Sequence, residues 1–148
     1  MTTTKIYSKE NLPQKTERTT IIKFLHNHLD QYGDAEQDIE KAVSYALGEN
    51  GKPGGLIITA KHESSENISG VCVINKTGMS GYIPENILVY IATDRQVRGK
   101  GIGKRILQTS IESTEGDIAL HCEPDNPAKF LYEKIGFQSK YLEMRLKK

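Results

Sequence analysis

The stretch that decides the fold is Thr93-Asp94-Arg95-Gln96-Val97-Arg98-Gly99-Lys100-Gly101-Ile102-Gly103-Lys104-Arg105. Its three alternating glycines lie between a strongly apolar segment and a segment whose apolar residues recur at helical spacing. Glycine lets the backbone approach a ligand closely and adopt positive φ, and the first N–H groups of a helix are free to bind an anion. Five basic side chains share the stretch, opposed only by Asp94. The stretch therefore predicts a polyanion site, most simply for a pyrophosphate.

Two common phosphate-binding loops are excluded by the spacing of these residues. A Walker A motif ends in Gly-Lys-Ser/Thr, whereas Gly103-Lys104 is followed here by Arg105. A G-x-G-x-x-G dinucleotide fingerprint also fails, because no glycine stands at its sixth position, whichever glycine begins it. A glycine-rich turn with a solvated basic face remains the purely structural alternative.

The segments around this stretch predict an α/β domain with a mixed sheet. Residues Asn86–Thr93 are apolar enough on both faces to form a central strand. Thr16 or Thr19 is expected to cap the first helix, and Asp34 the second. The other strands are expected at 5–7, 56–60, 68–74 and 117–122, with final strands at Phe137 and Tyr141–Leu146. The first two helices carry apolar residues at helical spacing between Ile21 and Leu29 and between Ile39 and Leu47, and two further helices are expected at 101–114 and 127–135.

Composition indicates one globular domain, residues 1–148. Twenty basic and nineteen acidic residues give a net charge of +1, which disfavours nucleic acid and anionic lipid as partners. The start of the chain lacks the apolar stretch of a secretory signal, so we expect a cytoplasmic protein with Cys72 and Cys122 as buried thiols. His26, His28 and His62 show no metal-ligand spacing, and no metal is expected.

Two motifs together resemble one known family. Arg98-x-x-Gly101-x-Gly103 resembles the R/Q-x-x-G-x-G/A pyrophosphate loop of the GCN5-related N-acetyltransferase (GNAT) superfamily. Further along, Asn126-Pro127-Ala128-Lys129-Phe130-Leu131-Tyr132-Glu133-Lys134-Ile135-Gly136-Phe137 is similar to the family's N-x-x-A-x-x-x-Y-E-K-x-G-F segment. The two motifs stand in the family's order, separated by one expected helix and one expected strand. The resemblance covers about Asn86 to Phe137.

The resemblance implies a GNAT-like fold and a cofactor site. That fold has a mixed, mostly antiparallel central sheet flanked by about four helices, splayed between the central strand and the strand after the pyrophosphate-loop helix. In the family, backbone groups of the central strand pair with the pantetheine arm of coenzyme A, and the loop backbone wraps its pyrophosphate. The family's asparagine normally stands where Asp125 is here, and Asn126 follows one residue later. The implied cofactor-binding residues are Ile91, Ala92, Thr93, Arg98, Gly99, Lys100, Gly101, Ile102, Gly103, Lys104 and Asn126.

The resemblance also implies a catalytic tyrosine. In the family the tyrosine at the position of Tyr132 lies over the thioester sulfur, where it would act as a general acid toward the leaving thiolate. A tyrosine has that proton at neutral pH, because its reference pKa is near 10. A tyrosine that only packs its ring is the alternative. Glu123, His121 and Glu85 are candidates for the base that deprotonates the amine, although a water-mediated route needs none of them.

The implied function is that of an acetyl-CoA-dependent N-acetyltransferase, an acyltransferase acting by direct attack of a primary amine in a ternary complex. The alternative is a non-catalytic acyl-CoA-binding regulatory module. The acceptor is a small-molecule or protein amine, and a homodimer is frequent among such enzymes. The acidic residues of the second expected helix would favour a cationic amine or form a solvated face: Asp34, Glu36, Asp38 and Glu40.

Overall fold

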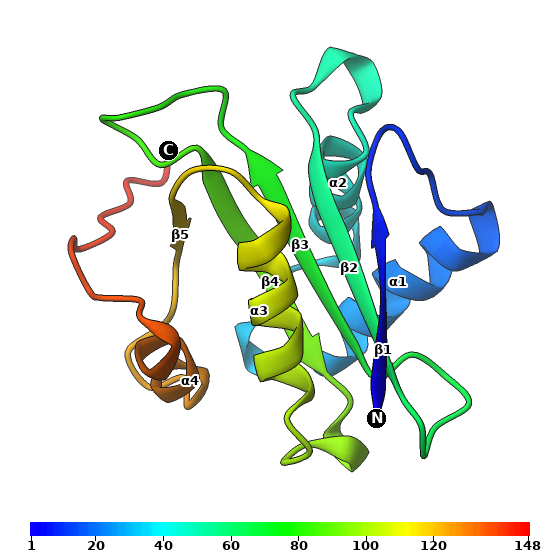
Figure 1. The fold of residues 1–148 in the computed structure, drawn as a ribbon. Coiled ribbons are helices and arrows are strands. Elements are labelled where there is room, and N and C mark those ends of the chain that lie inside the picture. The colour runs from blue at the N-terminus through cyan, green and yellow to red at the C-terminus, as the bar shows by residue number, and fades with distance from the viewer.

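The computed structural model describes residues 1–148 as one five-stranded sheet with helices on both faces (Figure 1). None of the helices combines the length and the apolar character needed to cross a membrane. The strands are β1 (Thr2–Tyr7), β2 (Gly55–His62), β3 (Gly70–Lys76), β4 (Asn86–Thr93) and β5 (Ile118–Leu120). The helices are α1 (Lys15–His28), α2 (Glu36–Ala46), α3 (Ile102–Ser113) and α4 (Ala128–Ile135), with short 3-10 turns η1 (Asp30–Tyr32), η2 (Glu49–Gly51) and η3 (Arg95–Val97).

The sheet has the spatial order β1-β2-β3-β4-β5. The first four strands are antiparallel neighbours, and β5 runs parallel to β4. Helices α1 and α2 pack on one face around Leu25, Ile39 and Val43, whereas α3 and α4 pack on the other around Ile106 and Leu107 (Figure 1). Each face thus has its own apolar core, and the mixed, mostly antiparallel sheet agrees with the fold that the sequence predicts.

Strand β4 bends away from β5 halfway along its length. In the ladder with β3, Val73 is opposite Tyr90 and Ile74 is opposite Leu88, so Val89 is an extra residue on β4. Such a bulge bends the strand that carries it. Only Asn86–Leu88 pair with β5, and Ile91–Thr93 have β3 as their one neighbour. The predicted splay between β4 and β5 is therefore confirmed, and the bend explains why β5 ends at Leu120 rather than at Cys122.

The helix starts differ from those that the sequence predicts. Helix α1 begins after Gln14, which forms a capping box with Glu17, so neither Thr16 nor Thr19 is the cap. Helix α2 follows Ala35 and has no side-chain cap, because the carboxylate of Asp34 instead accepts a hydrogen bond from Tyr90. Both cap predictions are therefore wrong. They chose residue types that often cap helices, and Asp34 does not cap α2 because Tyr90, distant in the sequence, binds its carboxylate.

The C-terminal tail, residues 137–148, contains no strand, so the strands predicted at Phe137 and Tyr141–Leu146 are wrong. The apolar side chains of the tail are largely exposed, at 85% for Tyr141 and 90% for Leu142. The tail returns past β5 without pairing with it (Figure 1). Alternating polarity gave this segment the pattern of a strand, but a strand forms only where a neighbour accepts its backbone hydrogen bonds.

Candidate active site

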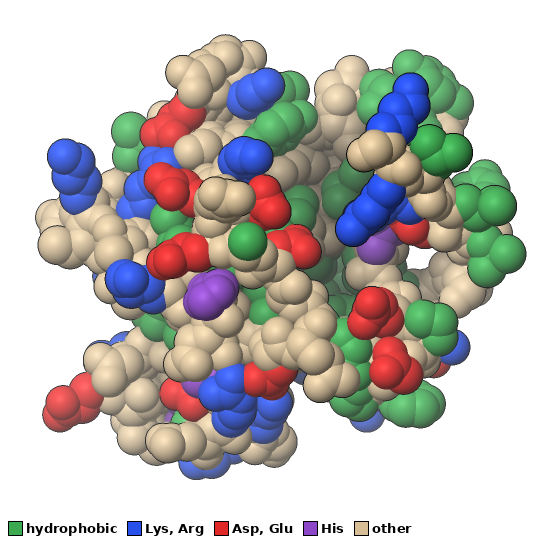
Figure 2. Space-filling model, turned by 180° about the vertical axis from the view of Figure 1, so that it is seen from behind, with side chains coloured by type: hydrophobic (Ala, Val, Ile, Leu, Met, Phe, Trp, Pro, Cys, Tyr) green, Lys and Arg blue, Asp and Glu red, His purple; other side chains and the backbone are tan.

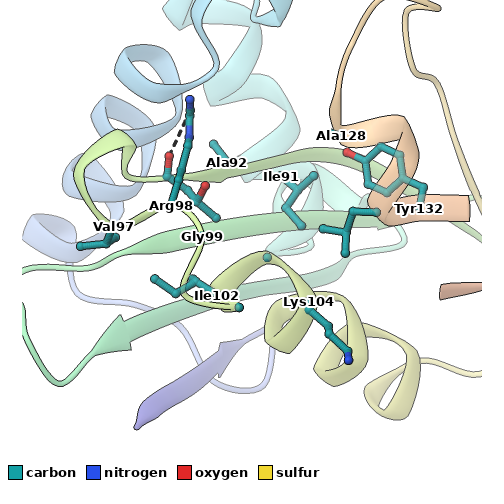
Figure 3. A pocket seen from close by; sticks show the side chains of 13 residues that line it. Ile91, Ala92, Val97, Arg98, Gly99, Ile102, Lys104, Ala128 and Tyr132 are labelled. Carbon is teal, nitrogen blue, oxygen red and sulfur yellow. Dashed lines mark hydrogen bonds between the residues drawn. The ribbon is translucent and has the colours of Figure 1, made fainter. Parts of the chain in front are cut away.

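A cavity of about 260 Å³ lies where β4 parts from β5, between the end of β4, the start of α3 and helix α4 (Figure 3). Most residues that the sequence assigns to cofactor binding line it, whereas Lys100 and Asn126 do not. The lining residues are Ile91, Ala92, Thr93, Val97, Arg98, Gly99, Gly101, Ile102, Gly103, Lys104, Ala128, Leu131 and Tyr132.

One end of the cavity is formed by the glycine loop (Arg95–Gly101), which joins β4 to α3. Gly99 and Gly101 have φ of 84° and 77°, a left-handed backbone that favours glycine. From Arg98 to Lys104 no backbone N–H donates to a carbonyl, and the first to do so is that of Arg105, to Gly101 O at 3.0 Å. Free N–H groups at a helix start and in such a turn form an anion-binding concavity.

Gly103 is needed for close packing rather than for a left-handed backbone, because its φ is not positive. A Cβ there would lie 3.2 Å from Leu131 Cδ2 and 3.8 Å from Thr93 Cγ2. Gly103 thus allows the first turn of α3 to approach both β4 and α4.

Two basic side chains of the glycine loop are already bound within the protein. Arg95 donates to Asp30 and to the carbonyl of Asn27. Arg98 donates to His28 O at 3.2 Å and to Thr93 O at 3.3 Å, and its guanidinium is directed toward the end of α1 (Figure 3). The backbone of the loop, with the exposed lysines beside it, is thus what remains free for an anion.

Tyr132 lies at the other end of the cavity, on α4. The residue is 7% exposed, and its ring meets Phe137 edge-on at 6.0 Å. Its hydroxyl points from α4 toward β4 (Figure 3), and no protein group hydrogen-bonds it. Burial raises the pKa of Tyr132 above its ordinary value, with smaller contributions from Cys122 and Cys72. The phenol is therefore a proton donor that stays neutral at pH 7.

The other residues named from the sequence lie outside the cavity. Glu123 and His121 are exposed beyond the end of β5. Asn126 lies two residues before α4, where its side-chain oxygen accepts the N–H of Ala128, the first residue of the helix, at 2.9 Å. Glu85 stands at the opposite end of β4, where its carboxylate accepts the N–H of Asp117 at 3.0 Å. This contact lowers the pKa of Glu85, and its place removes it from the candidates for a base at the cavity.

The side of the splay opposite the cavity is bordered by the strap (Leu29–Asp34), the segment that joins α1 to α2. Tyr32 donates to the carbonyl of Asp125 at 3.3 Å, and Tyr90 of β4 donates to Asp34. Figure 2 shows this side from behind as a groove between the surface around α1 and α2 and the part built by α4 and the tail. Acidic side chains gather on the α1–α2 side of that groove (Figure 2).

Sequence reasoning missed several residues of this region. Val97, Ala128 and Leu131 line the cavity. They lie within or directly beside the two sequence motifs, so their closeness to residues already assigned to the site could have identified them. Tyr32 and Tyr90 carried no such signal, because each acts through a residue far away in the chain.

Comparison with known proteins identifies the family to which the chain is similar. A family model described as "Acetyltransferase (GNAT) domain" matches residues 53–139, more than half of the chain. No curated protein sequence matches significantly.

Solved structures share the fold. PH1933 from Pyrococcus horikoshii OT3 is 24% identical, with a TM-score of 0.66 over 96% of this chain and 93% of that chain. A probable acetyltransferase is 16% identical, with a TM-score of 0.71 over 99% of both chains. The ribosomal-protein-S18-alanine N-acetyltransferase of Escherichia coli is 15% identical, with a TM-score of 0.67 over 94% of this chain and 80% of that chain.

Proposed function

Because the chain belongs to the GNAT acetyltransferase family, we propose that it is an acetyl-CoA-dependent N-acetyltransferase that transfers an acetyl group to a primary amine. One observation carries the proposal: a single cavity has free backbone N–H groups at one end and the unpartnered Tyr132 hydroxyl at the other. A diphosphate suits the first end, and a leaving thiolate needs the second.

The residues present fit acetyl-CoA as the cosubstrate. The backbone from Arg98 to Lys104 would hold the diphosphate, and the edge of Ile91–Thr93 that lacks a strand partner would pair with the amides of pantetheine. The apolar wall made by Ile91, Ile102 and Leu131 would exclude water around the thioester.

Direct attack is the reaction we propose. The amine nitrogen bonds to the acetyl carbon and the bond from that carbon to sulfur breaks, so the thiolate needs a proton and the nitrogen loses one. Tyr132 supplies the proton to sulfur, because burial keeps its phenol neutral. Water at the open side of the splay takes the proton from nitrogen, since neither Glu123 nor Glu85 lines the cavity.

The decisive experiment compares Tyr132→Phe with wild type after a screen of small-molecule and peptide amines by release of free coenzyme A thiol. We expect kcat to fall about 100-fold or more, the range for loss of a general acid, with the calorimetric Kd for coenzyme A nearly unchanged. Tyr45→Phe is the matched control, because Tyr45 lies on α2 and donates to the carbonyl of Lys76 at the end of β3, away from the cavity. Full activity of Tyr132→Phe contradicts the acid role. Coenzyme A binding without turnover of any amine favours the acyl-CoA-binding module.

A further inference from the structure

Asp30 holds two arginines of the glycine loop. Its Oδ1 accepts a hydrogen bond from Arg95 Nε at 2.9 Å and a second from Arg95 Nη2, and its Oδ2 lies 3.6 Å from Arg98 Nη2. Arg95 also donates a hydrogen bond to the carbonyl of Asn27, near the end of α1. A carboxylate that receives a guanidinium through two donors forms one of the stronger surface ion pairs.

The backbone at Asp30 is also specialised. Its φ is 55°, and besides Asn50 it is the one non-glycine residue with positive φ in the chain. Aspartate and asparagine tolerate this conformation better than other side chains. The left-handed residue turns the chain sharply out of α1, and this turn directs the carboxylate back toward the glycine loop.

The strap that begins here reaches the other side of the splay. Tyr32 donates to Asp125 O, and Asp125 directly precedes Asn126, whose side chain accepts the N–H of Ala128 at the start of α4, the helix that carries Tyr132. Asp34, at the end of the strap, accepts a hydrogen bond from Tyr90 of β4. The strap therefore contacts the glycine loop, the central strand and the turn that leads into α4. The loop, the strand and α4 are the three parts that enclose the cavity.

We propose that Asp30 is a positioning residue: it fastens the glycine loop to the strap, so that a nucleotide diphosphate bound in the loop also orders the strap beside the groove on the other side of the splay. The inference rests on the proposed function for the identity of the loop's ligand. Binding that immobilises Arg95–Gly101 restricts whatever is fastened to that loop, which links two sites without a large movement.

The test is amide hydrogen exchange by NMR, with and without coenzyme A at a concentration that calorimetry shows to be saturating for each variant. The amides of Tyr32 and Gly33 are the reporters, because they donate to Leu29 O and Asp30 O within the strap. Asp30→Asn removes the charge and keeps a side chain that accepts positive φ. Arg95→Gln breaks the same pair from its other side. Glu36→Gln is the control, since it removes a nearby charge whose partner is Lys23 at 3.6 Å on the surface.

In wild type and Glu36→Gln, coenzyme A should slow exchange at Tyr32 and Gly33 by at least about threefold. In Asp30→Asn and Arg95→Gln it should slow exchange at Ile102 and Gly103 but leave the strap amides unchanged. Equal slowing of the strap in Asp30→Asn, or no slowing in wild type that binds coenzyme A, overturns the inference. Wild type that binds no coenzyme A refutes the proposed function itself, and the inference with it.

Discussion

Gly101→Ala tests whether the left-handed turn of the glycine loop is what binds the anion. Gly101 has φ 77° and ψ 14°, and a Cβ added there meets nothing within 4 Å. The substitution therefore introduces backbone strain and no clash. A left-handed alanine costs roughly 1–2 kcal/mol, and replacing glycine in the unfolded chain offsets about 0.4–1 kcal/mol of it. The net penalty is about 1 kcal/mol.

This penalty should appear mainly in binding, because the loop around Gly101 is exposed and free to relax. A loop that relaxes must return to the left-handed turn when a diphosphate binds, which raises the Kd for coenzyme A about fivefold at 1 kcal/mol. Gly51→Ala is the matched control: Gly51 has φ 74°, equally open surroundings and a place far from the cavity, in η2. It should leave the Kd unchanged, because Gly51 takes no part in the glycine loop.

The measurements are calorimetric titration with coenzyme A and urea unfolding of both variants. If Gly101→Ala leaves both the Kd and the free energy of unfolding at their wild-type values, the turn is not strained and the reasoning fails. If Gly51→Ala weakens binding as much as Gly101→Ala, the effect does not arise in the glycine loop.

Two further predictions concern stability. Gly70→Ala would place a Cβ 2.5 Å from Ile106 Cδ1, so urea unfolding should show a loss of about 1–3 kcal/mol, and Ile106→Val, which removes Cδ1, should recover part of it. Tyr7 donates a hydrogen bond to Glu17 at 2.6 Å, and this bond lowers the pKa of Glu17. The hydrogen bond that Glu17 accepts from the N–H of Gln14 adds a smaller lowering. Because the folded pKa lies below the unfolded one, this stabilisation is present above about pH 4.5 and is lost as pH falls through the folded pKa. Glu17→Gln should therefore lose less stability than wild type between pH 6 and pH 3, and equal losses would contradict this origin.

The cavity could be predicted from sequence because its parts are short and continuous in the chain. The alternating glycines, the start of α3 and the face of α4 that carries Tyr132 each depend on neighbours within a few residues. The bounds of β4 were predicted fully, since its apolar run ends at Thr93, where the glycine loop begins. Local preference and tertiary structure agree along this part of the chain.

The remaining features depend on partners that no local pattern reveals. Asp34 has the residue type of a helix cap, but Tyr90 lies close enough to take its carboxylate, and α2 begins without a side-chain cap. The tail has the alternation of a strand in Leu142-Glu143-Met144-Arg145-Leu146, yet β5 is three residues long and pairs only with β4. Periodicity reports which face of a segment is apolar, and it does not report whether a neighbour is present.

The arginine of the loop motif shows how a correct motif can mislead about the role of a side chain. Sequence reasoning counts Arg98 among the charges available to a diphosphate, but the structure directs its guanidinium to the carbonyls of His28 and Thr93 and toward Asp30. Arg95, outside the motif, is committed to the same carboxylate. Under the proposed function, attraction of the diphosphate therefore falls to the N–H groups at the start of α3 and the exposed lysines beside them, while the arginines connect the loop to α1 and to the strap.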